Sequence, residues 1–174
     1  MSPARTGAAL SAAVVVCSDG VSAGERVDRS GAVARERLLE IGFDVGAVTV
    51  VADERDAIEA ELGRLVAVGT NLVVTSGGTG FGRRDVTPEA TLAVVEREAP
   101  GLAEAVRAAS PVPFGMLTRG VAGIAGRTVV VNLPGSTGGV RDGIDALAPG
   151  LVHACELAAG GTSGHPHAAP PTAN

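Results

Sequence analysis

The sequence contains no lysine, so all 14 of its basic residues are arginines. A Walker P-loop needs a lysine directly after its glycines, where the amine reaches the outer phosphates of the nucleotide. A Schiff-base mechanism also requires a lysine amine. The missing lysine therefore excludes the common ATPase and GTPase loop as well as Schiff-base catalysis.

Aromatic residues are nearly absent too: they make up 2% of the chain, and neither Trp nor Tyr occurs. We expect an aliphatic core of Val, Leu, Ile and Ala, because 45% of the residues are hydrophobic. Few aromatic rings leave little for nucleic acid bases to stack on, and a net charge of −5 opposes binding to a phosphate backbone. No nucleic acid partner is expected.

Cysteine is scarce: Cys17 and Cys155 lie far apart, without a Cys-x-x-Cys or Cys/His cluster. This spacing predicts neither a zinc site nor a disulfide framework, so we expect two reduced, buried thiols. No apolar stretch is long enough to span a bilayer. The apolar run at residues 8–17 could pass for a signal-peptide core, but it lacks a small-residue cleavage pattern and fits a first core strand better. We expect a cytoplasmic protein with no membrane partner.

The most informative segment is Thr-Ser-Gly-Gly-Thr-Gly-Phe-Gly-Arg-Arg-Asp-Val-Thr-Pro-Glu at residues 75–89. The apolar run at 71–75 leads into it and predicts a buried strand. Thr87 is expected to cap a helix whose first position is Pro88. This order of strand, glycine loop and helix predicts a ligand site, because open α/β sheets bind ligands at the carboxyl ends of strands. The helix begins too far beyond the glycines for a dinucleotide-binding fingerprint.

Apolar periodicity predicts strands and helices in turn over one domain. Strands are expected at 11–18, 45–51, 71–75 and 128–132, with a short strand near Val121. Helices are expected at 30–41, 54–68, 88–97, from 100 to about 109, and in two pieces on either side of Pro149-Gly150. Such alternation predicts an α/β fold with a mainly parallel sheet covered on both faces. We expect a flexible N-terminus at 1–10, the single domain at 11–159 and a disordered tail at 160–174.

Acidic residues stand where strands end or helices begin, at Asp53, Asp85 and Glu89. Carboxylates in such places can hold Mg²⁺ and bridge it to substrate phosphates. Asp53 could instead cap the following helix, and Glu89 could complement the helix dipole. Asp85 directly follows the glycine loop, which favours a binding role.

Groups that could hold a phosphate lie near these carboxylates. Arg83 and Arg84 follow the glycine loop, and arginine forks bind phosphate oxygens; a solvated surface pair is the alternative. The turn Pro-Gly-Ser-Thr-Gly-Gly at 134–139 again joins a strand to a helix, whose N-terminus could receive an anion. Ser18-Asp19-Gly20 at the end of the first strand is a third candidate, with a plain turn as its alternative. The histidines form no catalytic arrangement with Ser, Cys or Asp.

The runs Ser-Gly-Gly-Thr-Gly at 76–80 and Arg-Asp-Val-Thr-Pro-Glu-Ala at 84–90 resemble the signature of molybdenum cofactor biosynthesis proteins of the MogA/MoaB type. Other blocks are similar to the same family: Ser18-Asp19, Asp28, Ser30-Gly31, Asp53-Glu54, Pro100-Gly101, Thr118-Arg119 and Asn132-Leu133-Pro134-Gly135. The resemblance covers about residues 11–158.

This resemblance implies a three-layer α/β/α domain with a mostly parallel central sheet that usually forms homotrimers. In MogA-type members the activity is molybdopterin adenylylation: molybdopterin and Mg-ATP give adenylylated molybdopterin and pyrophosphate. The product is primed for molybdate insertion, so a molybdate-insertion enzyme is a further expected partner.

The resemblance also assigns roles to individual residues. The essential carboxylates of such enzymes match Asp53 and Asp85, which are expected to be catalytic and to bind Mg²⁺. Substrate and nucleotide contacts are expected from Ser18, Asp19, Gly77, Gly78, Thr79, Gly80, Arg84, Glu89, Thr118, Arg119, Asn132, Pro134, Gly135 and Ser136. Within this set the glycine loops are expected at the nucleotide and phosphates, and Ser18, Thr118 and Arg119 at the pterin.

Two departures from the family pattern bear on function. Thr118-Arg119 stands where relatives often have Ser-Arg, which keeps the hydroxyl. Thr137-Gly138-Gly139 stands where many relatives carry a lysine, and Arg141 could substitute for it. The alternative to an enzyme is a non-catalytic MoaB-type pterin-binding or scaffold protein. The carboxylates Asp53 and Asp85 favour the enzyme, whereas the changed turn at 137–139 slightly favours the binding or scaffold protein.

Overall fold

One seven-stranded sheet forms the centre of the protein, in the order β2-β1-β4-β7-β6-β5, with β3 also paired to β1. The computed structural model describes residues 9–111 and 113–161. Its strands are β1 Ser11–Cys17, β2 Asp44–Val45, β3 Thr49–Val51, β4 Leu72–Ser76, β5 Arg97–Glu98, β6 Ala122–Ala125 and β7 Thr128–Leu133. The β5–β6 and β6–β7 pairings are antiparallel and the others are parallel, so the mostly parallel sheet is confirmed.

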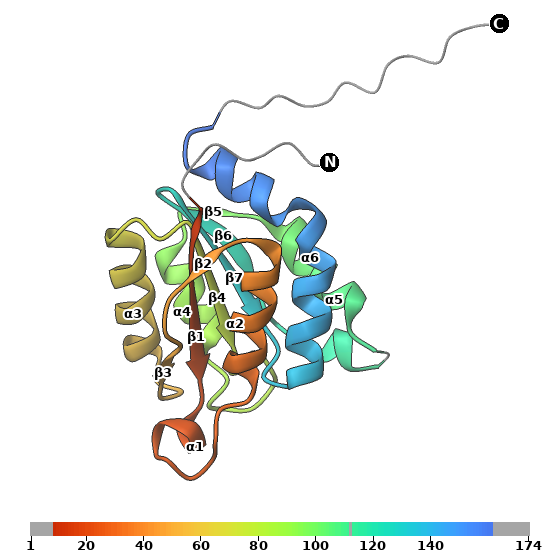
Figure 1. Ribbon diagram of the computed structural model, residues 1–174. Coiled ribbons are helices and arrows are strands. Elements are labelled where there is room, and N and C mark those ends of the chain that lie inside the picture. Colours follow the sequence, from red (N-terminus) through yellow and green to blue (C-terminus); the bar gives the residue numbers. More distant parts are fainter. Residues whose placement is uncertain (1–8, 112, 162–174) are drawn as a thin grey trace, which may run out of the picture.

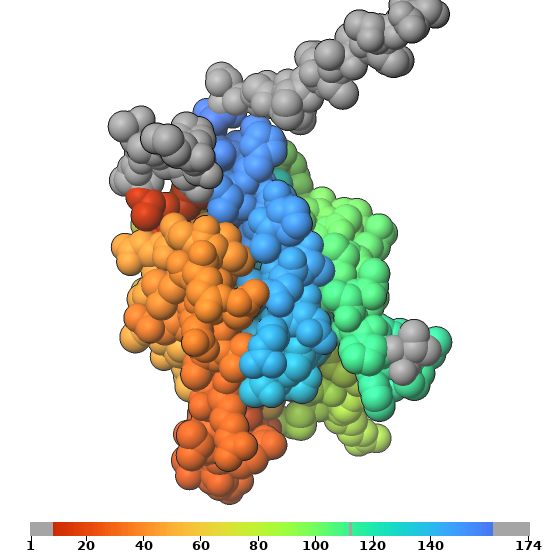
Figure 2. Space-filling model, turned by 45° about the vertical axis from the view of Figure 1, so that its right-hand side comes forward, coloured from red at the N-terminus to blue at the C-terminus, as the bar shows by residue number. Residues whose placement is uncertain are grey.

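Helices cover both faces of this sheet (Figure 1). They are α1 Asp19–Ser22, α2 Ser30–Ile41, α3 Arg55–Ala67, α4 Thr87–Val94, α5 Pro100–Ala109 and α6 Thr137–Ala158, with a 3-10 helix η1 at Phe114–Leu117. Helices α2, α5 and α6 lie on one face, where Figure 2 shows α6 running beside α2, and α3 and α4 pack together on the other. The expected three-layer α/β/α arrangement is therefore confirmed.

The central strands are buried on both sides because their residues alternate between two cores. Val14 and Val16 of β1 face α2 and α6, whereas Val15 and Cys17 face α3 and α4. Runs of consecutive apolar residues, such as the three valines of β1, are what a sheet covered on both faces requires. The core is aliphatic except for Phe43, and both cysteines are free and buried, as expected.

Strand register brings the functional loops to one edge of the sheet. Val16 pairs with Ser76, and Ser76 pairs with Leu133, so β1, β4 and β7 end side by side. From β1 the chain goes through α2 to β2 and β3 on one side, and then through α3 to β4 on the other. The connections therefore diverge between β1 and β4, which is the point where doubly wound sheets bind ligands.

Several expected boundaries are wrong. The strand expected at 45–51 is divided into β2 and β3, α4 ends at Val94, and the strand β5 follows it where helix was expected. The two helices expected around Pro149 are one, α6. Leu147 and Leu151 of α6 are buried four residues apart on either side of Pro149, and this packing offsets the roughly 3 kcal/mol that an interior proline costs.

Smaller differences concern helix starts and the chain ends. Residues 19–22 form the one-turn helix α1 rather than loop, and Val86 rather than Thr87 is the N-cap of α4. Of the expected flexible N-terminus and disordered tail, residues 1–8 and 162–174 lie outside the described part, so both expectations stay predictions. Within the described part, no helix combines the length and apolar character needed to cross a bilayer.

We expect Leu38→Ala to lower the free energy of unfolding by about 2–5 kcal/mol, because this α2 side chain is fully buried and its loss leaves a cavity. Its neighbour Leu39 is 42% exposed, so Leu39→Ala should change stability by less than about 1 kcal/mol. Urea unfolding followed by circular dichroism measures both values. Equal effects would contradict the observed orientation of α2.

Candidate functional site

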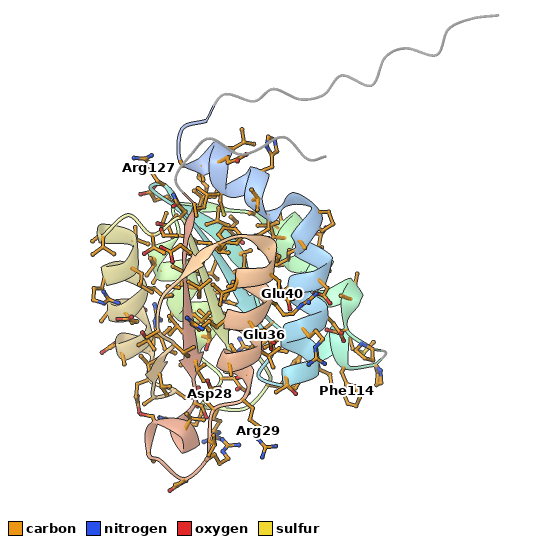
Figure 3. The ribbon with its side chains drawn as sticks, viewed as in Figure 1. Asp28, Arg29, Glu36, Glu40, Phe114 and Arg127 are labelled. Atoms are coloured by element: carbon orange, nitrogen blue, oxygen red, sulfur yellow. The ribbon has the colours of Figure 1, made fainter. Side chains whose placement is uncertain are left out.

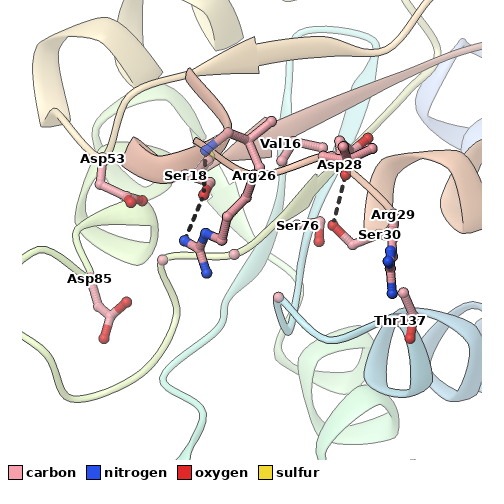
Figure 4. A pocket seen from close by; sticks show the side chains of 16 residues that line it. Val16, Ser18, Arg26, Asp28, Arg29, Ser30, Asp53, Ser76, Asp85 and Thr137 are labelled. Atoms are coloured by element: carbon pink, nitrogen blue, oxygen red, sulfur yellow. Dashed lines mark hydrogen bonds between the residues drawn. The ribbon is translucent and has the colours of Figure 1, made fainter. Parts of the chain in front are cut away.

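Two adjoining cavities open at the carboxyl edge of the sheet. The first, of about 340 Å³, lies along the loops that follow β1, β3 and β4 (Figure 4). The second, of about 630 Å³, lies between the glycine loop, the start of α6 and the segment around η1. Gly77, Gly78, Asp85 and Gly135 line both cavities and form their common wall. Their volumes fall in the range of small-molecule sites, roughly 300–1,000 Å³.

The structure brings the two key carboxylates together. Asp53 follows β3 and Asp85 follows the glycine loop after β4, yet both line the first cavity. Most of the other predicted contact residues line one or both cavities: Ser18, Gly77, Gly78, Thr79, Gly80, Thr118, Pro134, Gly135 and Ser136. Five line neither of the two: Asp19, Arg84, Glu89, Arg119 and Asn132.

Asp19 and Asp53 form a reciprocal pair across the sheet edge. The backbone N–H of Asp19 donates to Asp53 Oδ2 over 2.9 Å, and the backbone N–H of Asp53 donates to Asp19 Oδ1 over 3.0 Å. Asp53 does not cap α3, because Glu54 holds the N-cap position and no side chain makes a capping hydrogen bond there. The capping alternative for Asp53 is therefore wrong.

Arg84 supports this pair from outside. Its Nε and Nη2 donate to the two oxygens of Asp19 over 3.0 and 2.9 Å, and its Nη1 lies 2.7 Å from Glu54 Oε1. The guanidinium holds the pKa of Asp19 below its usual value. Two carboxylates thus engage the arginine that the sequence suggested for phosphate binding.

Arg119 braces the glycine loop. Its backbone N–H donates to Thr79 O over 2.8 Å, and its Nε donates to Gly80 O over 2.7 Å. Its Nη2 donates to Asp85 O over 2.5 Å, and its Nη1 pairs with Glu89 of α4. The same guanidinium lowers the pKa of Glu89. Arg119 therefore fixes the backbone that carries Asp85.

Asn132 of β7 lies inside the sheet, only 2% exposed. Its Nδ2 donates to the hydroxyls of Thr75 and Thr91 over 3.0 and 2.8 Å, and its Oδ1 accepts from Val121 N over 3.1 Å. All three bonds tie neighbouring elements together, so the structure places this side chain behind the cavity wall.

Gly77 and Gly78 let the loop pass close to its neighbours. Their φ angles are 98° and 63°, in the region that favours glycine. A Cβ on Gly77 would lie 2.4 Å from Cys17 O, and one on Gly78 would lie 2.3 Å from Thr87 Oγ1 and 3.1 Å from Asp53 Oδ1. No other residue fits at either position without displacing the loop.

Two polar atoms beneath Gly78 lack hydrogen-bond partners in the described part of the chain: Asp53 Oδ1 and Thr87 Oγ1, both buried. Burial raises the pKa of Asp53, and the nearby negative charges of Asp19 and Asp85 add to the effect. Burial also raises the pKa of the adjacent Cys17 thiol to about 12, which keeps it neutral. The hydrogen bond from Asp19 N to Oδ2 therefore compensates the ionised Asp53 only in part.

A divalent cation fits this arrangement. Asp53 has an unpartnered carboxylate oxygen and shares a cavity with Asp85. The described residues contain no cluster of three or more His, Cys, Asp or Glu that could hold a metal alone. Mg²⁺ in nucleotide sites commonly takes only one or two carboxylates and completes its shell with phosphates and water. Asp53 and Asp85 therefore suit a cation that arrives with a phosphate substrate.

The second cavity has an apolar wall that the sequence analysis missed. Pro111, Phe114, Leu117 and Pro134 line it, and the exposed Phe114 lies at the edge of the molecule in Figure 3. The signal was present, since three large apolar residues that are exposed in the structure, Phe114, Met116 and Leu117, follow the sequence Ser-Pro-Val-Pro. Such a wall suits a flat organic ring.

Cations of the first cavity were missed as well. Arg26 and Arg29 line it together with Thr137 at the start of α6, whereas Arg141 lines neither cavity. Nothing in the local sequence distinguishes these arginines from solvated ones, because they lie in a polar loop remote from the glycine motif.

Comparisons with known proteins point to one family. A family model described as "Probable molybdopterin binding domain" matches residues 13–153. The molybdopterin adenylyltransferase of Helicobacter pylori is 37% identical over 157 residues, which cover 84% of this chain and 86% of that protein. The molybdenum cofactor biosynthesis bifunctional protein of Chlorobaculum tepidum is 37% identical over 150 residues; the match covers 85% of this chain but only 48% of that protein. The solved structure of the molybdopterin biosynthesis enzyme MoaB from Thermus thermophilus superimposes with a TM-score of 0.82 at 42% identity, covering 87% of this chain and 97% of that one.

Gly78→Ala is expected to lower the free energy of unfolding by about 1–3 kcal/mol, because the added methyl meets Thr87 and the backbone is in the left-handed region. Gly138→Ala is the matched control: it lies in the first turn of α6 with open space around it, so stability should stay the same or rise by up to about 1 kcal/mol. Chemical unfolding of both variants measures this. A tolerated alanine at 78 would show that the loop does not approach Thr87.

Asp53→Asn is expected to raise the thermal unfolding midpoint at neutral pH. The folded state raises the pKa of this carboxyl, so its ionisation opposes folding above the folded pKa and has no such effect below the unfolded one. The increase in the unfolding midpoint over wild type should therefore become smaller as the pH falls to about 4. Thermal scans at the two pH values measure the difference.

Asp19→Asn is the control, because its effect on stability at neutral pH should be opposite to that of Asp53→Asn. The pKa of Asp19 is lowered, so its ionisation favours folding above the unfolded pKa, and that contribution disappears as the pH falls through the folded pKa. This variant should lose stability at neutral pH. If the two variants changed stability at neutral pH in the same direction, the electrostatic roles assigned to Asp53 and Asp19 would be contradicted.

Proposed function

The chain belongs to the MogA/MoaB-type family of molybdenum cofactor biosynthesis proteins, and from this we propose that it transfers AMP from Mg-ATP to the phosphate of molybdopterin. One observation carries the proposal: Asp53 and Asp85, from separate loops, line the same cavity beside a glycine loop. The H. pylori relative that matches over most of this chain is named for this activity.

Two adjoining cavities with a common wall suit a reaction that joins two substrates. The second cavity, with its apolar wall at Phe114 and Leu117, is proposed to hold the pterin, and the first to hold the nucleotide phosphates. Ser18 and Thr118 line different cavities, so Thr118 alone is kept at the pterin end. Asp85, in the common wall, lies where the reacting groups meet.

In the proposed reaction a phosphate oxygen of molybdopterin attacks the α-phosphorus of ATP. A new phosphorus–oxygen bond forms, the bond from the α-phosphorus to the bridging oxygen breaks, and pyrophosphate leaves with that electron pair. The attacking oxygen is already ionised, so no general base is required and the protein's task is alignment and charge neutralisation.

The residues share these tasks. Asp53 and Asp85 would hold Mg²⁺, whose charge offsets that of the phosphates. The backbone N–H groups of Gly78 and Thr137, which line the first cavity, would donate to phosphate oxygens, whereas the Gly77 N–H already donates to Leu133 O over 3.2 Å. For Asp19, Arg84, Glu89, Arg119 and Asn132 we propose supporting rather than substrate-binding roles, because none of them lines either cavity.

A non-catalytic molybdopterin-binding or scaffold protein is the second candidate. One observation favours it: Thr137-Gly138-Gly139 contributes no cation to the second loop, and Arg141 lines neither cavity. Under either function we also propose that the protein forms a homotrimer, is cytoplasmic and passes its bound molybdopterin or product to a molybdate-insertion enzyme.

Purified protein given molybdopterin and Mg-ATP is expected to release pyrophosphate. Asp85→Asn should reduce this rate by at least about 100-fold, because the Mg²⁺ that offsets the negative charge of the transition state would lose a carboxylate ligand. Asp56→Asn is the control, since Asp56 is exposed at the start of α3 and lines neither cavity. Thermal unfolding of each variant confirms an intact fold. Wild-type protein that binds molybdopterin without releasing pyrophosphate would refute adenylyl transfer and support the binder.

A further inference from the structure

Two arginines of the first cavity stand apart from the others near the site. Arg26 and Arg29 both line this cavity, and among the described residues neither forms an ion pair with a carboxylate. Arg84 is held by Asp19 and Glu54, and Arg119 by Glu89. Arg83 of the glycine motif lines neither cavity, so the two arginines that line the first cavity both lie outside that motif.

Arg26 is directed into the cavity by its surroundings. Its side chain folds back over Gly20, where a Cβ would lie 2.5 Å from Arg26 Nε, and its Nη2 lies 3.4 Å from Ser18 Oγ. Figure 4 shows the guanidinium on the side of the cavity where Asp53 and Asp85 lie. A glycine at position 20 leaves room for this path.

Arg29 lies on the other side of the cavity. It precedes α2, and Figure 4 shows it on the side of Thr137 at the start of α6. The N-terminus of this 22-residue helix favours negative charge. Arg29 thus supplies from another element the cation that the turn at 137–139 lacks.

Charge balance limits what this site can bind. Asp28, Asp53 and Asp85 also line the cavity, so without a cation its carboxylates outnumber the two arginines. Asp28 is engaged by α2, accepting from Gly31 N over 2.9 Å and from Ser30 Oγ over 3.2 Å. A bound Mg²⁺ would reverse the excess, so an anion should bind together with the metal and poorly without it.

We propose that Arg26 and Arg29 bind the outer phosphates of the nucleotide and hold the pyrophosphate that leaves. This inference rests on the proposed function, because it assigns residues to the polyphosphate of that reaction. It follows from two arginines without acidic partners that lie on opposite sides of one cavity. Their planar forks match phosphate oxygens and can bind two at once.

Binding of inorganic pyrophosphate tests the proposal, measured by isothermal titration calorimetry with and without Mg²⁺. Wild-type protein is expected to bind in the presence of Mg²⁺. Arg26→Gln and Arg29→Gln should each raise the Kd by about 10-fold or more, because each removes charge-assisted hydrogen bonds. Arg141→Gln is the control: it removes the same charge from an exposed site that lines neither cavity, and should change the Kd less than about 2-fold.

Three results would overturn the proposal: no pyrophosphate binding by wild-type protein with Mg²⁺, an unchanged Kd in both cavity variants, or an equal loss in Arg141→Gln. Unchanged thermal unfolding midpoints exclude misfolding. Arg26→Lys keeps the charge but lacks the planar guanidinium, so its Kd for pyrophosphate should lie between those of wild type and Arg26→Gln. The two proposals fail separately. If pyrophosphate binding depends on the two arginines but the protein transfers no AMP, the role of the arginines stands and adenylyl transfer is refuted. If the protein transfers AMP but pyrophosphate binding does not depend on the arginines, only the role of the arginines is refuted.

Discussion

The reciprocal hydrogen bonds between Asp19 and Asp53 determine the shape of the site. They join the loop after β1 to the loop after β3 with bonds of 2.9 and 3.0 Å, so both strands end at a fixed separation. Bringing two carboxylates together is unfavourable, and Arg84 relieves the repulsion more at Asp19, to which it donates two hydrogen bonds, than at Asp53. The remaining unfavourable energy lies at Asp53: its pKa is raised, and its Oδ1 has no hydrogen-bond partner in the described part of the chain.

The glycine loop closes this arrangement from the β4 side. Gly77 passes within reach of Cys17 O and Gly78 over Thr87 and Asp53, so the loop and the Asp19–Asp53 pair form one packed unit. Arg119 then ties the far end of the loop to Glu89 and to the backbone of Asp85. Asp53 and Asp85 are therefore positioned in part by Asp19, Arg119 and Glu89, none of which lines the first cavity.

The parts of this protein that follow local rules were predictable from the sequence. The aliphatic strands, the helix at 30–41 and the glycine loop at the sheet edge depend on neighbouring residues, and the structure confirms them. The roles of Arg84 and Asn132 depend on distant partners: Asp19 is 65 residues from Arg84, and Thr75 is 57 residues from Asn132. Arg26 and Arg29 were overlooked for the same reason, since only the fold shows that their loop borders the cavity. The continuity of α6 through Pro149 likewise depends on tertiary packing that outweighs a local signal.

The excess of acid in the first cavity bears on whether the protein is a catalyst or a binder. A protein that only binds an anionic pterin gains nothing from an ionised carboxylate in a partly buried position, and would bind better with a net positive cavity. Three carboxylates facing two unpaired arginines make sense if a divalent cation enters with a polyphosphate, because the ligand then supplies the charge that the protein lacks. If the protein has the proposed function, the unfavourable burial of Asp53 is of the kind that functional sites retain at a cost in stability. The same charge excess would keep the nucleotide from binding without its metal, and so would favour productive complexes.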